Sequence, residues 1–336
     1  MAIKVAINGF GRIGRLVARG LNADKRFNLV AVNDLTDAEM LAHLFKYDSV
    51  HGRYPGGEVS ALKSGHIKAG SNKFRVYAEP DPAKLPWNKH RVDIVIESTG
   101  LFRKRKDAAK HMDAGAGKVI ISAPSPDADI MIVMGVNHQK YRKSKHDIIS
   151  TASCTTNCLA PVASVLDKKF GISYGLMTTI HAYTNDQNIL DAPHKKDYRR
   201  ARACAVSMIP TSTGAAKAVG VVMPRLKGKM NGIAVRVPTP DGSLVDLTVG
   251  LKKNATVEKI NKAMRAAAGR SLRGILEYTE DPMVSVDVVG NPHSSIFDGA
   301  STMQIKPRVF KLLAWYDNEY GYAMRMVDMA RWVATR

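Results

Sequence analysis

Cysteine is scarce in this chain of 336 residues, which contains only Cys154, Cys158 and Cys204. Three cysteines cannot build a disulfide framework, and an odd number leaves at least one thiol free. This usage favours a reducing, cytoplasmic setting. The sequence also lacks a run of about 18 apolar residues, so no membrane-spanning helix is predicted. Its first residues, MAIKVAINGFGRIG, do not have the pattern of a secretory signal.

Acidic residues are few: 30 Asp and Glu stand against 50 Lys and Arg, which gives a formal net charge of +20. Such a surface attracts anions, whether phosphorylated metabolites, dinucleotides or nucleic acid. The basic residues are spread along the chain in short clusters, such as RKRK at 103–106, KKDYRR at 195–200 and RLKGK at 225–229. Because no concentrated basic stripe or recognition motif accompanies them, charge alone does not identify the partner.

The first half of the chain alternates short apolar runs with helical patterns. Continuous apolar runs of this length are typical of parallel strands that are covered on both faces. They occupy residues 4–8, 28–34, 92–99, 118–122, 130–136 and 147–151. Helical patterns over 12–23 and 103–114 supply the crossovers between them. We therefore predict a doubly wound α/β domain of the Rossmann type over residues 1–151.

Residues 152–317 carry longer runs with partial alternation, which is typical of antiparallel strands with one packed face. These runs cover 174–184, 232–240, 243–253 and 309–318, and helical patterns appear near 210–222 and 256–268. This half is predicted to be a catalytic α+β domain with a mainly antiparallel sheet. The last segment, 318–336, has an apolar stripe at helical spacing that consists of Tyr320, Ala323, Met324, Val327, Ala330 and Val333. We expect it to form a helix that returns to the first domain.

A glycine-rich segment, NGFGRIG, places Gly9, Gly11 and Gly14 in the spacing G-x-G-x-x-G. It follows a predicted strand and opens a predicted helix, and Asp34 lies 20 residues beyond Gly14 at the end of the second strand. This is the context of a dinucleotide site, where glycines admit the pyrophosphate and a carboxylate accepts hydrogen bonds from the ribose. Since a carboxylate repels a 2′-phosphate, NAD is favoured over NADP. A plain strand–helix turn is the alternative.

The segment STASCTTNC places Cys154 and Cys158 four residues apart. A zinc site would need two further ligands, and a disulfide across one helical turn has awkward geometry. A reactive thiol and a structural pair remain. If Ser153 caps a helix that begins at Cys154, the helix N-terminus lowers the pKa of that thiol, while Cys158 packs one turn further in. Pro161 is expected to kink or shorten this helix.

His181 is the candidate base, because it ends the predicted strand GLMTTIH just before the polar turn AYTND. A thiolate beside a nicotinamide adds to an aldehyde, and the hemithioacetal then loses hydride to NAD⁺. The resulting thioester needs a second nucleophile to cleave it. Such chemistry requires a base within reach of the sulfur. A purely structural histidine is the alternative at this position.

Six blocks, in order along the chain, resemble the phosphorylating glyceraldehyde-3-phosphate dehydrogenases: INGFGRIGR, TASCTTNC, HAYTNDQNILD, PTSTGAAKAVG, RVPTPDGSLVDLTV and WYDNEYGYAMR. The resemblance covers essentially the whole chain. It implies that D-glyceraldehyde 3-phosphate is oxidised to 1,3-bisphosphoglycerate with NAD⁺ and inorganic phosphate, as in glycolysis and gluconeogenesis. Cys154 is then the nucleophile that carries the thioester, and His181 is its base. The resemblance also implies a homotetramer, in which the loop 183–207 lines a neighbour's cofactor groove.

The resemblance assigns further residues to the cofactor and to two phosphate sites. Besides the glycines and Asp34, the implied cofactor contacts are Arg12, Ile13, Ser122, Asn318 and Tyr322. The implied ligands of the substrate phosphate are Thr184 and Arg236. Those of the inorganic phosphate are Ser153, Thr155, Thr213 and Gly214, with Arg200 serving both sites. Hydroxyls, backbone N–H groups and guanidinium forks are the donors that phosphate oxygens need. No metal site is predicted.

Three positions depart from the family pattern. Ala192 stands where a larger apolar residue often packs near the adenine ribose, which leaves room for some use of NADP. Pro80 replaces a frequent basic residue, and Cys204 adds a thiol with no assigned role.

Two alternative functions are retained. One is an erythrose-4-phosphate dehydrogenase, which has the same thiol chemistry but tends to lose the phosphate-site residues kept here at Thr184 and in TSTG. The other is a basic nucleic-acid-binding protein. Weak binding of RNA through the dinucleotide groove would compete with NAD and would fall steeply with added salt.

Overall fold

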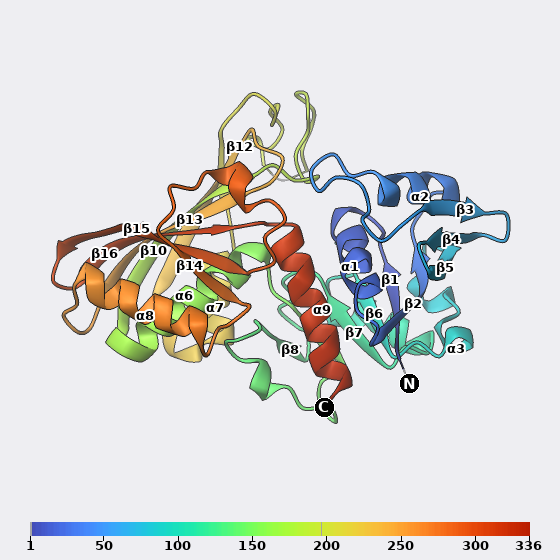
Figure 1. Cartoon of the computed structure of the whole chain (residues 1–336), viewed down its shortest axis with the longest axis horizontal. Coiled ribbons are helices and arrows are strands. Elements are labelled where there is room, and N and C mark those ends of the chain that lie inside the picture. Colours follow the sequence, from blue (N-terminus) through green and yellow to red (C-terminus); the bar gives the residue numbers. More distant parts are fainter. Residues whose placement is uncertain (1, 196) are drawn as a thin grey trace. The chain divides into compact units, whose positions relative to one another are not determined.

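The computed structural model describes residues 2–195 and 197–336, which divide into two compact units (Figure 1). The first unit contains the chain up to Ile132, together with His138–Ala152 and Ala323–Arg336. The second contains Val133–Asn137 and Ser153–Tyr322. Compared with the limits predicted from the sequence, a short segment after Ile132 belongs to the second unit, and so do the first residues of the terminal helix. Lys196, in the basic cluster 195–200, lies outside the described residues.

A nine-stranded sheet organises the first unit, in the order β3-β4-β5-β2-β1-β6-β7-β9-β8. Six of its strands were predicted: β1 (Ile3–Asn8), β2 (Phe27–Asn33), β6 (Ile94–Glu97), β7 (Lys118–Ile121), β8 (Ile130–Met131) and β9 (Ile148–Ser150). They pair in parallel, with β1 between β2 and β6. Because the strand order reverses at β1, the ends of β1 and β6 frame the crevice where this class of sheet binds its ligands. The predicted doubly wound sheet is confirmed.

Three strands at one edge of this sheet were not predicted: β3 (Val59–Leu62), β4 (His66–Ala69) and β5 (Asn72–Tyr77). They form an antiparallel meander, and β5 adds to β2 in parallel. Each strand is short and mixes buried with exposed residues, so no apolar run marks it in the sequence.

The helices of the first unit are α1 (Arg12–Asn22), α2 (Ala38–Lys46), α3 (Trp87–His90), α4 (Arg105–Ala108) and α5 (Lys110–Asp113). The predicted helix over 103–114 is therefore two short helices that meet at Ala109. The terminal helix, α9 (Tyr320–Ala334), packs on α1 at Gly20, where a Cβ would lie 2.6 Å from Met324 Cε. Its return to the first unit agrees with the prediction.

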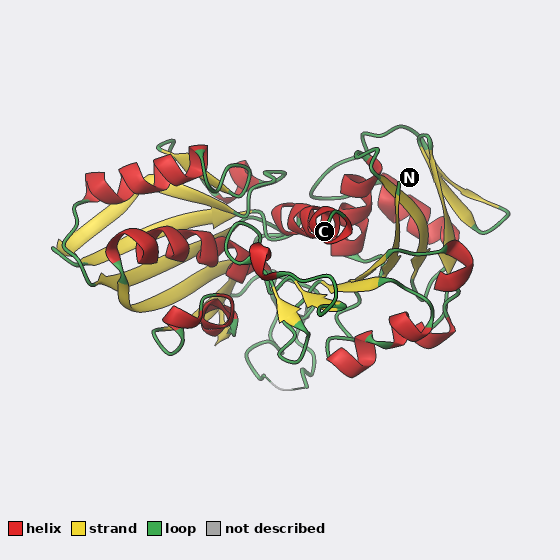
Figure 2. Cartoon of the chain, turned by 90° about the horizontal axis from the view of Figure 1, so that it is seen from below, coloured by secondary structure: helices red, strands yellow, loops and turns green. Residues whose placement is uncertain are grey.

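A seven-stranded sheet organises the second unit, in the order β11-β12-β10-β13-β16-β15-β14. Its strands are β10 (Ile172–Ala182), β11 (Ile209–Ser212), β12 (Met230–Val237), β13 (Ser243–Leu251), β14 (Leu276–Thr279), β15 (Ser295–Lys306) and β16 (Val309–Tyr316). Most pairs are antiparallel, while β10–β12 and β14–β15 are parallel. Helices α6 (Cys154–Phe170), α7 (Ala215–Val222) and α8 (Val257–Gly269) pack against this sheet (Figure 2).

Two expectations for the second unit were wrong. Residues 209–212 form strand β11, so the helix expected over 210–222 begins only at Ala215. Pro161 does not shorten α6, which continues to Phe170; a kink at this residue stays a prediction. Pro161 lies among the buried residues of this helix, and its packing on the sheet outweighs the loss of one backbone hydrogen bond. In the described part of the chain, no helix combines the length and the apolarity that crossing a bilayer requires.

Candidate active site

The reactive cysteine predicted from the sequence lies at the first position of α6. Ser153 caps this helix, and its Oγ accepts a hydrogen bond from Thr156 N at 3.1 Å. The preceding residue, Ala152, has a φ of +59°, a left-handed conformation that costs a non-glycine residue about 1–2 kcal/mol. This sharp turn sets Cys154 in the first helical turn, beside N–H groups that have no partner within the helix.

Strand β10 brings His181 to this cysteine. His181 Nε2 lies 3.5 Å from Cys154 Sγ, which is within hydrogen-bond range for sulfur. The imidazole is buried, whereas Cys154 is partly exposed. A nucleophile within reach of a base is the minimal arrangement for covalent catalysis. The structure therefore brings together the two residues on which the predicted chemistry depends.

Arg236 contacts the other nitrogen of this imidazole from the neighbouring strand, β12. Its Nη1 lies 2.5 Å from His181 Nδ1 and 3.0 Å from the carbonyl oxygen of Ala182, which is itself 2.7 Å from Nδ1. A guanidinium only donates, so when it donates to Nδ1 the single imidazole proton must lie on Nε2. When Nδ1–H donates to Ala182 instead, Nε2 presents a lone pair to the sulfur. Only in the second tautomer is His181 a base for Cys154.

The electrostatics of the pair differ from the prediction. Burial and, to a smaller extent, the charge of Arg236 together lower the pKa of His181 to about 3. Desolvation raises the pKa of the Cys154 thiol, and this outweighs the opposing effects of Arg236 and of the hydrogen bond from Thr155 N–H. The expected lowering of the thiol pKa is therefore not found. At neutral pH both groups are uncharged, so the thiol must lose its proton during the reaction.

Cys158 is buried one turn further along α6, as predicted for a packing residue. Its Sγ lies 3.5 Å from Ser295 Oγ and 3.7 Å from the carbonyl oxygen of Ala314. Burial raises the pKa of Cys158 to about 12. A thiol with this pKa is not a nucleophile at neutral pH.

Tyr316 is a residue of this site that the sequence analysis missed. Its hydroxyl bonds with Thr155 Oγ1 at 2.8 Å and Thr179 Oγ1 at 2.9 Å, and its ring meets the His181 ring edge-on at a centroid distance of 5.9 Å. Tyr316 therefore fixes the imidazole from the side. It also engages the Thr155 hydroxyl, which the family resemblance assigns to inorganic phosphate, so Thr155 is buried and offers chiefly its backbone N–H. No local pattern around residue 316 signals this role.

Two helix N-termini meet beside the cysteine. The Thr156 hydroxyl lies 2.8 Å from Ser153 Oγ at the start of α6 and 3.4 Å from the carbonyl oxygen of Ala215 at the start of α7. Gly214 is the N-cap of α7, and the Thr213 hydroxyl accepts a hydrogen bond from Ala215 N at 3.2 Å. Helix N-termini attract anions through free N–H groups and the helix dipole. This arrangement suits the inorganic phosphate implied by the sequence.

The other two predicted phosphate ligands lie in the segment between β10 and β11. Arg200 is held by the side chains of Asp186 and Thr211, the latter at 2.9 Å from its Nε. Thr184 follows β10, and its backbone N lies 3.4 Å from Gln187 Oε1. Arg236 keeps one donor free, because its buried Nε has no hydrogen-bond partner among the described residues. Arg236 therefore has a guanidinium donor available for a substrate phosphate.

The second unit also holds the two cofactor residues predicted near the C-terminus. Asn318 Oδ1 accepts a hydrogen bond from Ser243 Oγ at 2.5 Å, and Ser243 Oγ accepts one from Ala182 N at 3.1 Å. Asn318 is thereby tied to the residue that follows His181. Tyr322 is buried in the first turn of α9.

A separate pocket of about 240 Å³ lies in the first unit, at the ends of β1, β2 and β6. Gly9, Gly11 and Asp34 line it, together with Asn8, Asn33, Leu35, Glu79, Pro80, Ser98, Thr99, Leu101 and Phe102. Asp34 Oδ2 accepts a hydrogen bond from Phe10 N at 2.7 Å, which fixes the carboxylate at the pocket. Of the other predicted cofactor residues, Arg12, Ile13, Gly14 and Ser122 are not part of this lining; Arg12 pairs with Asp48 at 2.6 Å.

The glycines at this pocket and directly beside it fit a dinucleotide. Gly9 has a φ of +89°, and a Cβ there would lie 2.5 Å from Thr99 N. At Gly14 a Cβ would lie 2.1 Å from the carbonyl oxygen of Gly9, so only glycine lets α1 approach β1 this closely. A Cβ at Gly11 would point into open space. Backbone, free space and a carboxylate therefore stand where NAD requires them.

Comparison with known proteins gives matches over both units. The family model described as "Glyceraldehyde 3-phosphate dehydrogenase, NAD binding domain" matches residues 3–105, and the one described as "Glyceraldehyde 3-phosphate dehydrogenase, C-terminal domain" matches residues 153–318. The chain is 58% identical to glyceraldehyde-3-phosphate dehydrogenase 1 of Bacillus subtilis and 58% identical to glyceraldehyde-3-phosphate dehydrogenase of Geobacillus stearothermophilus. A third relative, from Priestia megaterium, is 57% identical. Each alignment covers 100% of this chain and 99% of the relative.

Proposed function

Since the chain belongs to the glyceraldehyde-3-phosphate dehydrogenase family, we propose that it oxidises D-glyceraldehyde 3-phosphate to 1,3-bisphosphoglycerate, with NAD⁺ as the oxidant and inorganic phosphate as the acceptor. The observation that carries this proposal is the 3.5 Å approach of Cys154 Sγ to His181 Nε2 at the start of α6. The pocket at Gly9 and Asp34 is the proposed seat of NAD, and residues Arg12, Ile13, Gly14 and Ser122 then act around it rather than line it. Asn318 and Tyr322 are proposed to serve the nicotinamide half.

The reaction begins with the thiol of Cys154. His181 Nε2 takes the thiol proton while the sulfur forms a bond with the aldehyde carbon, because both groups are uncharged at neutral pH. The developing oxyanion is stabilised by the protonated imidazole and by backbone N–H at the cysteine. It then takes the proton back from His181, which gives the hemithioacetal hydroxyl and a neutral imidazole. NAD⁺, when bound in the pocket, would supply the acceptor for the hydride of the hemithioacetal carbon. His181 removes the hydroxyl proton in the same step, and a thioester on Cys154 remains.

Inorganic phosphate then cleaves the thioester. Its oxygen attacks the acyl carbon, the C–S bond breaks, and the sulfur leaves as a thiolate that recovers a proton. The N-termini of α6 and α7 are proposed to hold this phosphate through Ser153, Thr155 N–H, Thr213 and Gly214. Arg236 and Thr184 are proposed to hold the phosphate of the substrate, and Arg200 supports both sites from its anchor on Thr211.

Withdrawal of Arg236 toward a substrate phosphate would change His181. The guanidinium donates either to Nδ1 or to a phosphate oxygen, and a dianion is the stronger acceptor. Once released, Nδ1–H donates to Ala182 O, and Nε2 becomes the base that Cys154 needs. Substrate binding and activation of the thiol are coupled in this way.

One set of assays tests the function. We expect a burst of NADH from the wild-type enzyme with D-glyceraldehyde 3-phosphate, no burst from Cys154→Ser, and steady turnover only when phosphate is present. The same assay with erythrose 4-phosphate and with NADP⁺ tests the two related alternatives. Turnover that does not depend on phosphate, or a burst from Cys154→Ser, would refute the proposal.

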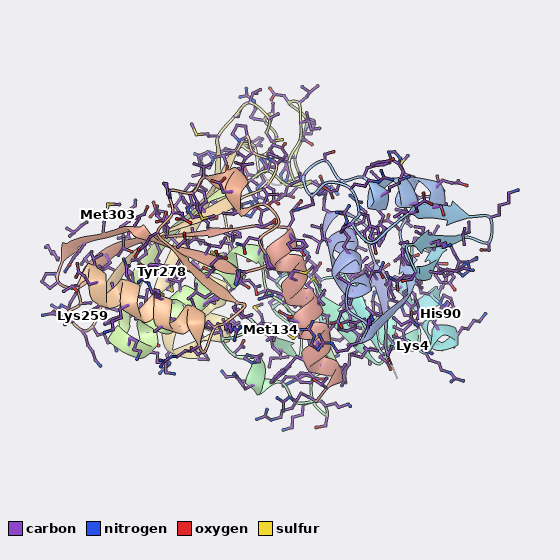
Figure 3. The ribbon with its side chains drawn as sticks, in the orientation of Figure 1. Lys4, His90, Met134, Lys259, Tyr278 and Met303 are labelled. Atoms are coloured by element: carbon purple, nitrogen blue, oxygen red, sulfur yellow. The ribbon has the colours of Figure 1, made fainter. Side chains whose placement is uncertain are left out.

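A homotetramer is proposed on the exposed apolar face of the second unit. On the face opposite its helices, the sheet exposes Tyr174 and Leu176 of β10, Ile233 of β12, and Met303 and Ile305 of β15 (Met303 is labelled in Figure 3). Leu176 is 65% exposed and Ile305 is 74% exposed. Exposed apolar side chains that gather on one face of a sheet mark interfaces. Sedimentation is expected to give four copies of the 36.7 kDa chain, and a monomer at micromolar concentration would refute the assembly.

We also propose that the protein works in the cytoplasm, because all three cysteines are free thiols in the structure.

A further inference from the structure

Beneath the pocket of the first unit lies a line of buried side chains that the proposed mechanism does not use. It consists of Trp87, His111 and Glu97, each at most 1% exposed. Trp87 Nε1 lies 3.0 Å from His111 Nδ1, and His111 Nε2 lies 3.0 Å from Glu97 Oε2. We call these three residues the relay. They come from α3, α5 and the end of β6.

The geometry fixes the protonation of the histidine. An indole N–H only donates, so His111 Nδ1 must be the acceptor at 3.0 Å. The imidazole proton therefore lies on Nε2, where it is donated to the Glu97 carboxylate. A proton on Nδ1 would set two donors against each other in a site without exposed surface. The Trp87 indole thus selects the tautomer that holds Glu97.

Glu97 is saturated by hydrogen bonds. Besides that of His111, its Oε2 accepts a bond from Asn8 Nδ2 at 2.6 Å. Its Oε1 accepts bonds from Thr99 N at 2.8 Å and from Thr99 Oγ1 at 2.5 Å. A buried carboxylate is stable only when its oxygens are paired in this way. If one of these donors is lost, the remaining hydrogen bonds to the Glu97 carboxylate must rearrange.

The partners of Glu97 continue into the pocket. Asn33 Nδ2 donates to Asn8 Oδ1 at 2.7 Å and to the carbonyl oxygen of Glu79 at 2.9 Å, and Asn33 Oδ1 accepts a bond from Glu79 N at 2.8 Å. Asn8, Asn33, Glu79 and Thr99 all line the pocket, and we call these four residues its polar floor. Asn8 and Thr99 bond directly with Glu97, whereas Asn33 is linked to it through Asn8, and Glu79 through Asn33 and Asn8. The relay itself does not line the pocket.

We propose that the relay is a positioning device, which sets affinity for the dinucleotide by holding the polar floor in its binding geometry. The inference rests on the proposed seat of NAD in this pocket. A preorganised floor binds its ligand without first losing side-chain freedom, so disordering it weakens binding even though the ligand contacts are chemically intact. The relay does not touch the reacting atoms. Its loss therefore acts on the dinucleotide and not on the thiol chemistry.

The test compares variants of His111 in the full-length enzyme. His111→Leu removes both ring nitrogens, whereas the side-chain amide of His111→Gln can still donate to Glu97. We expect the Kd for NAD⁺, measured by titration calorimetry, to rise at least tenfold in His111→Leu and to return to within threefold of the wild-type value in His111→Gln. The KM for D-glyceraldehyde 3-phosphate at saturating NAD⁺ and the alkylation rate of Cys154 by iodoacetamide are expected to stay within twofold.

Two further variants keep the test decisive. Trp87→Phe keeps an aromatic ring but loses the indole N–H, so it perturbs the relay even if His111→Leu does not fold. Its Kd for NAD⁺ is expected to rise at least threefold. His138→Leu is the matched control, because His138 packs edge-on against Trp332 at a centroid distance of 4.7 Å in the same unit but outside the relay. Its Kd is expected to stay unchanged.

Contrary results distinguish a failure of the relay proposal from a failure of the proposed function. An unchanged Kd for NAD⁺ in both His111→Leu and Trp87→Phe refutes the proposed positioning role of the relay. Asp34→Ala shows which premise has failed, because this residue lines the pocket outside the relay. If Asp34→Ala weakens NAD⁺ binding in that case, the site stands and only the relay is wrong. If Asp34→Ala also binds normally, the proposed seat of NAD is wrong as well. A role confined to the dinucleotide would also be refuted if the KM for D-glyceraldehyde 3-phosphate rose, or the alkylation rate of Cys154 fell, by as large a factor as the Kd for NAD⁺ rises.

Discussion

The guanidinium of Arg236 lies against Nδ1 of His181, 2.5 Å away, across the neighbouring strands β12 and β10. These two residues are directly opposite each other in the parallel register, so the contact follows from the sheet itself. One cation therefore contacts the imidazole and influences the pKa of both the imidazole and the thiol. Its position links substrate recognition to the state of the base.

Replacing Arg236 by leucine should separate these two roles. Charge-assisted hydrogen bonds to a phosphate contribute about 1.5–3 kcal/mol each, so kcat/KM for D-glyceraldehyde 3-phosphate should fall roughly ten- to a hundredfold or more. Because D-glyceraldehyde lacks the phosphate, its kcat/KM should fall far less. Steady-state assays with both aldehydes measure the difference. Equal losses for both would show that Arg236 acts only on the imidazole or the sulfur and does not bind the substrate phosphate.

Acid should destabilise this protein through His181. Its pKa is about 3 in the folded chain against an ordinary 6.5, so between these values the unfolded chain binds a proton that the folded chain does not. Stability therefore falls as the pH drops below about 6.5, by about 1.4 kcal/mol per pH unit from this residue. His181→Asn removes the effect.

Urea titrations at pH 7 and pH 5 measure the stability difference. Between these two values, the wild-type free energy of unfolding should fall by about 2 kcal/mol more than that of His181→Asn. His43→Asn is the control, because it removes an exposed histidine of α2 in place of a buried one. If the free energy of unfolding of His181→Asn falls between pH 7 and pH 5 by as much as that of the wild type, His181 is protonated in the folded chain.

Features that depend on neighbours in the sequence were predicted, and those that depend on distant residues were not. The Ser153 cap, the glycine turn from β1 into α1 and the parallel strands follow from local conformation and apolar runs. Tyr316 is 161 residues away from Thr155 in sequence, so no local pattern can reveal that their hydroxyls meet. The edge strands β3–β5 were missed for another reason, since strands of four to six residues with mixed burial show no clear period. The raised pKa of Cys154 depends on tertiary burial, which a capping motif does not report.

Tyr316→Phe should affect both stability and catalysis. The change leaves the hydroxyls of Thr155 and Thr179 without their shared partner inside the core, which costs about 1–3 kcal/mol in the free energy of unfolding. It also loosens the side support of His181, so kcat should fall several-fold while the KM for NAD⁺ stays unchanged. Urea titration and steady-state kinetics measure the two effects. Tyr278→Phe is the control, because its hydroxyl bonds with Glu280 at the surface, and a loss there as large as in Tyr316→Phe would refute the argument.

Asp34 should set the choice between NAD and NADP. Its carboxylate, held by Phe10 N and Leu35 N at 2.7 Å each, faces the pocket where a ribose 2′-phosphate would lie, and like charges repel. Asp34→Ala should therefore lower kcat/KM for NAD⁺ and raise the ratio of kcat/KM for NADP⁺ to that for NAD⁺ at least tenfold, because it removes both a ribose acceptor and the repulsion. Rates with each cofactor at saturating aldehyde and phosphate give this ratio. Asp37→Ala, which changes only the cap of α2, is the control for a general loss of negative charge nearby. An unchanged ratio in Asp34→Ala would show that cofactor choice is made elsewhere in the pocket, with Pro80 the first residue to replace by a basic one.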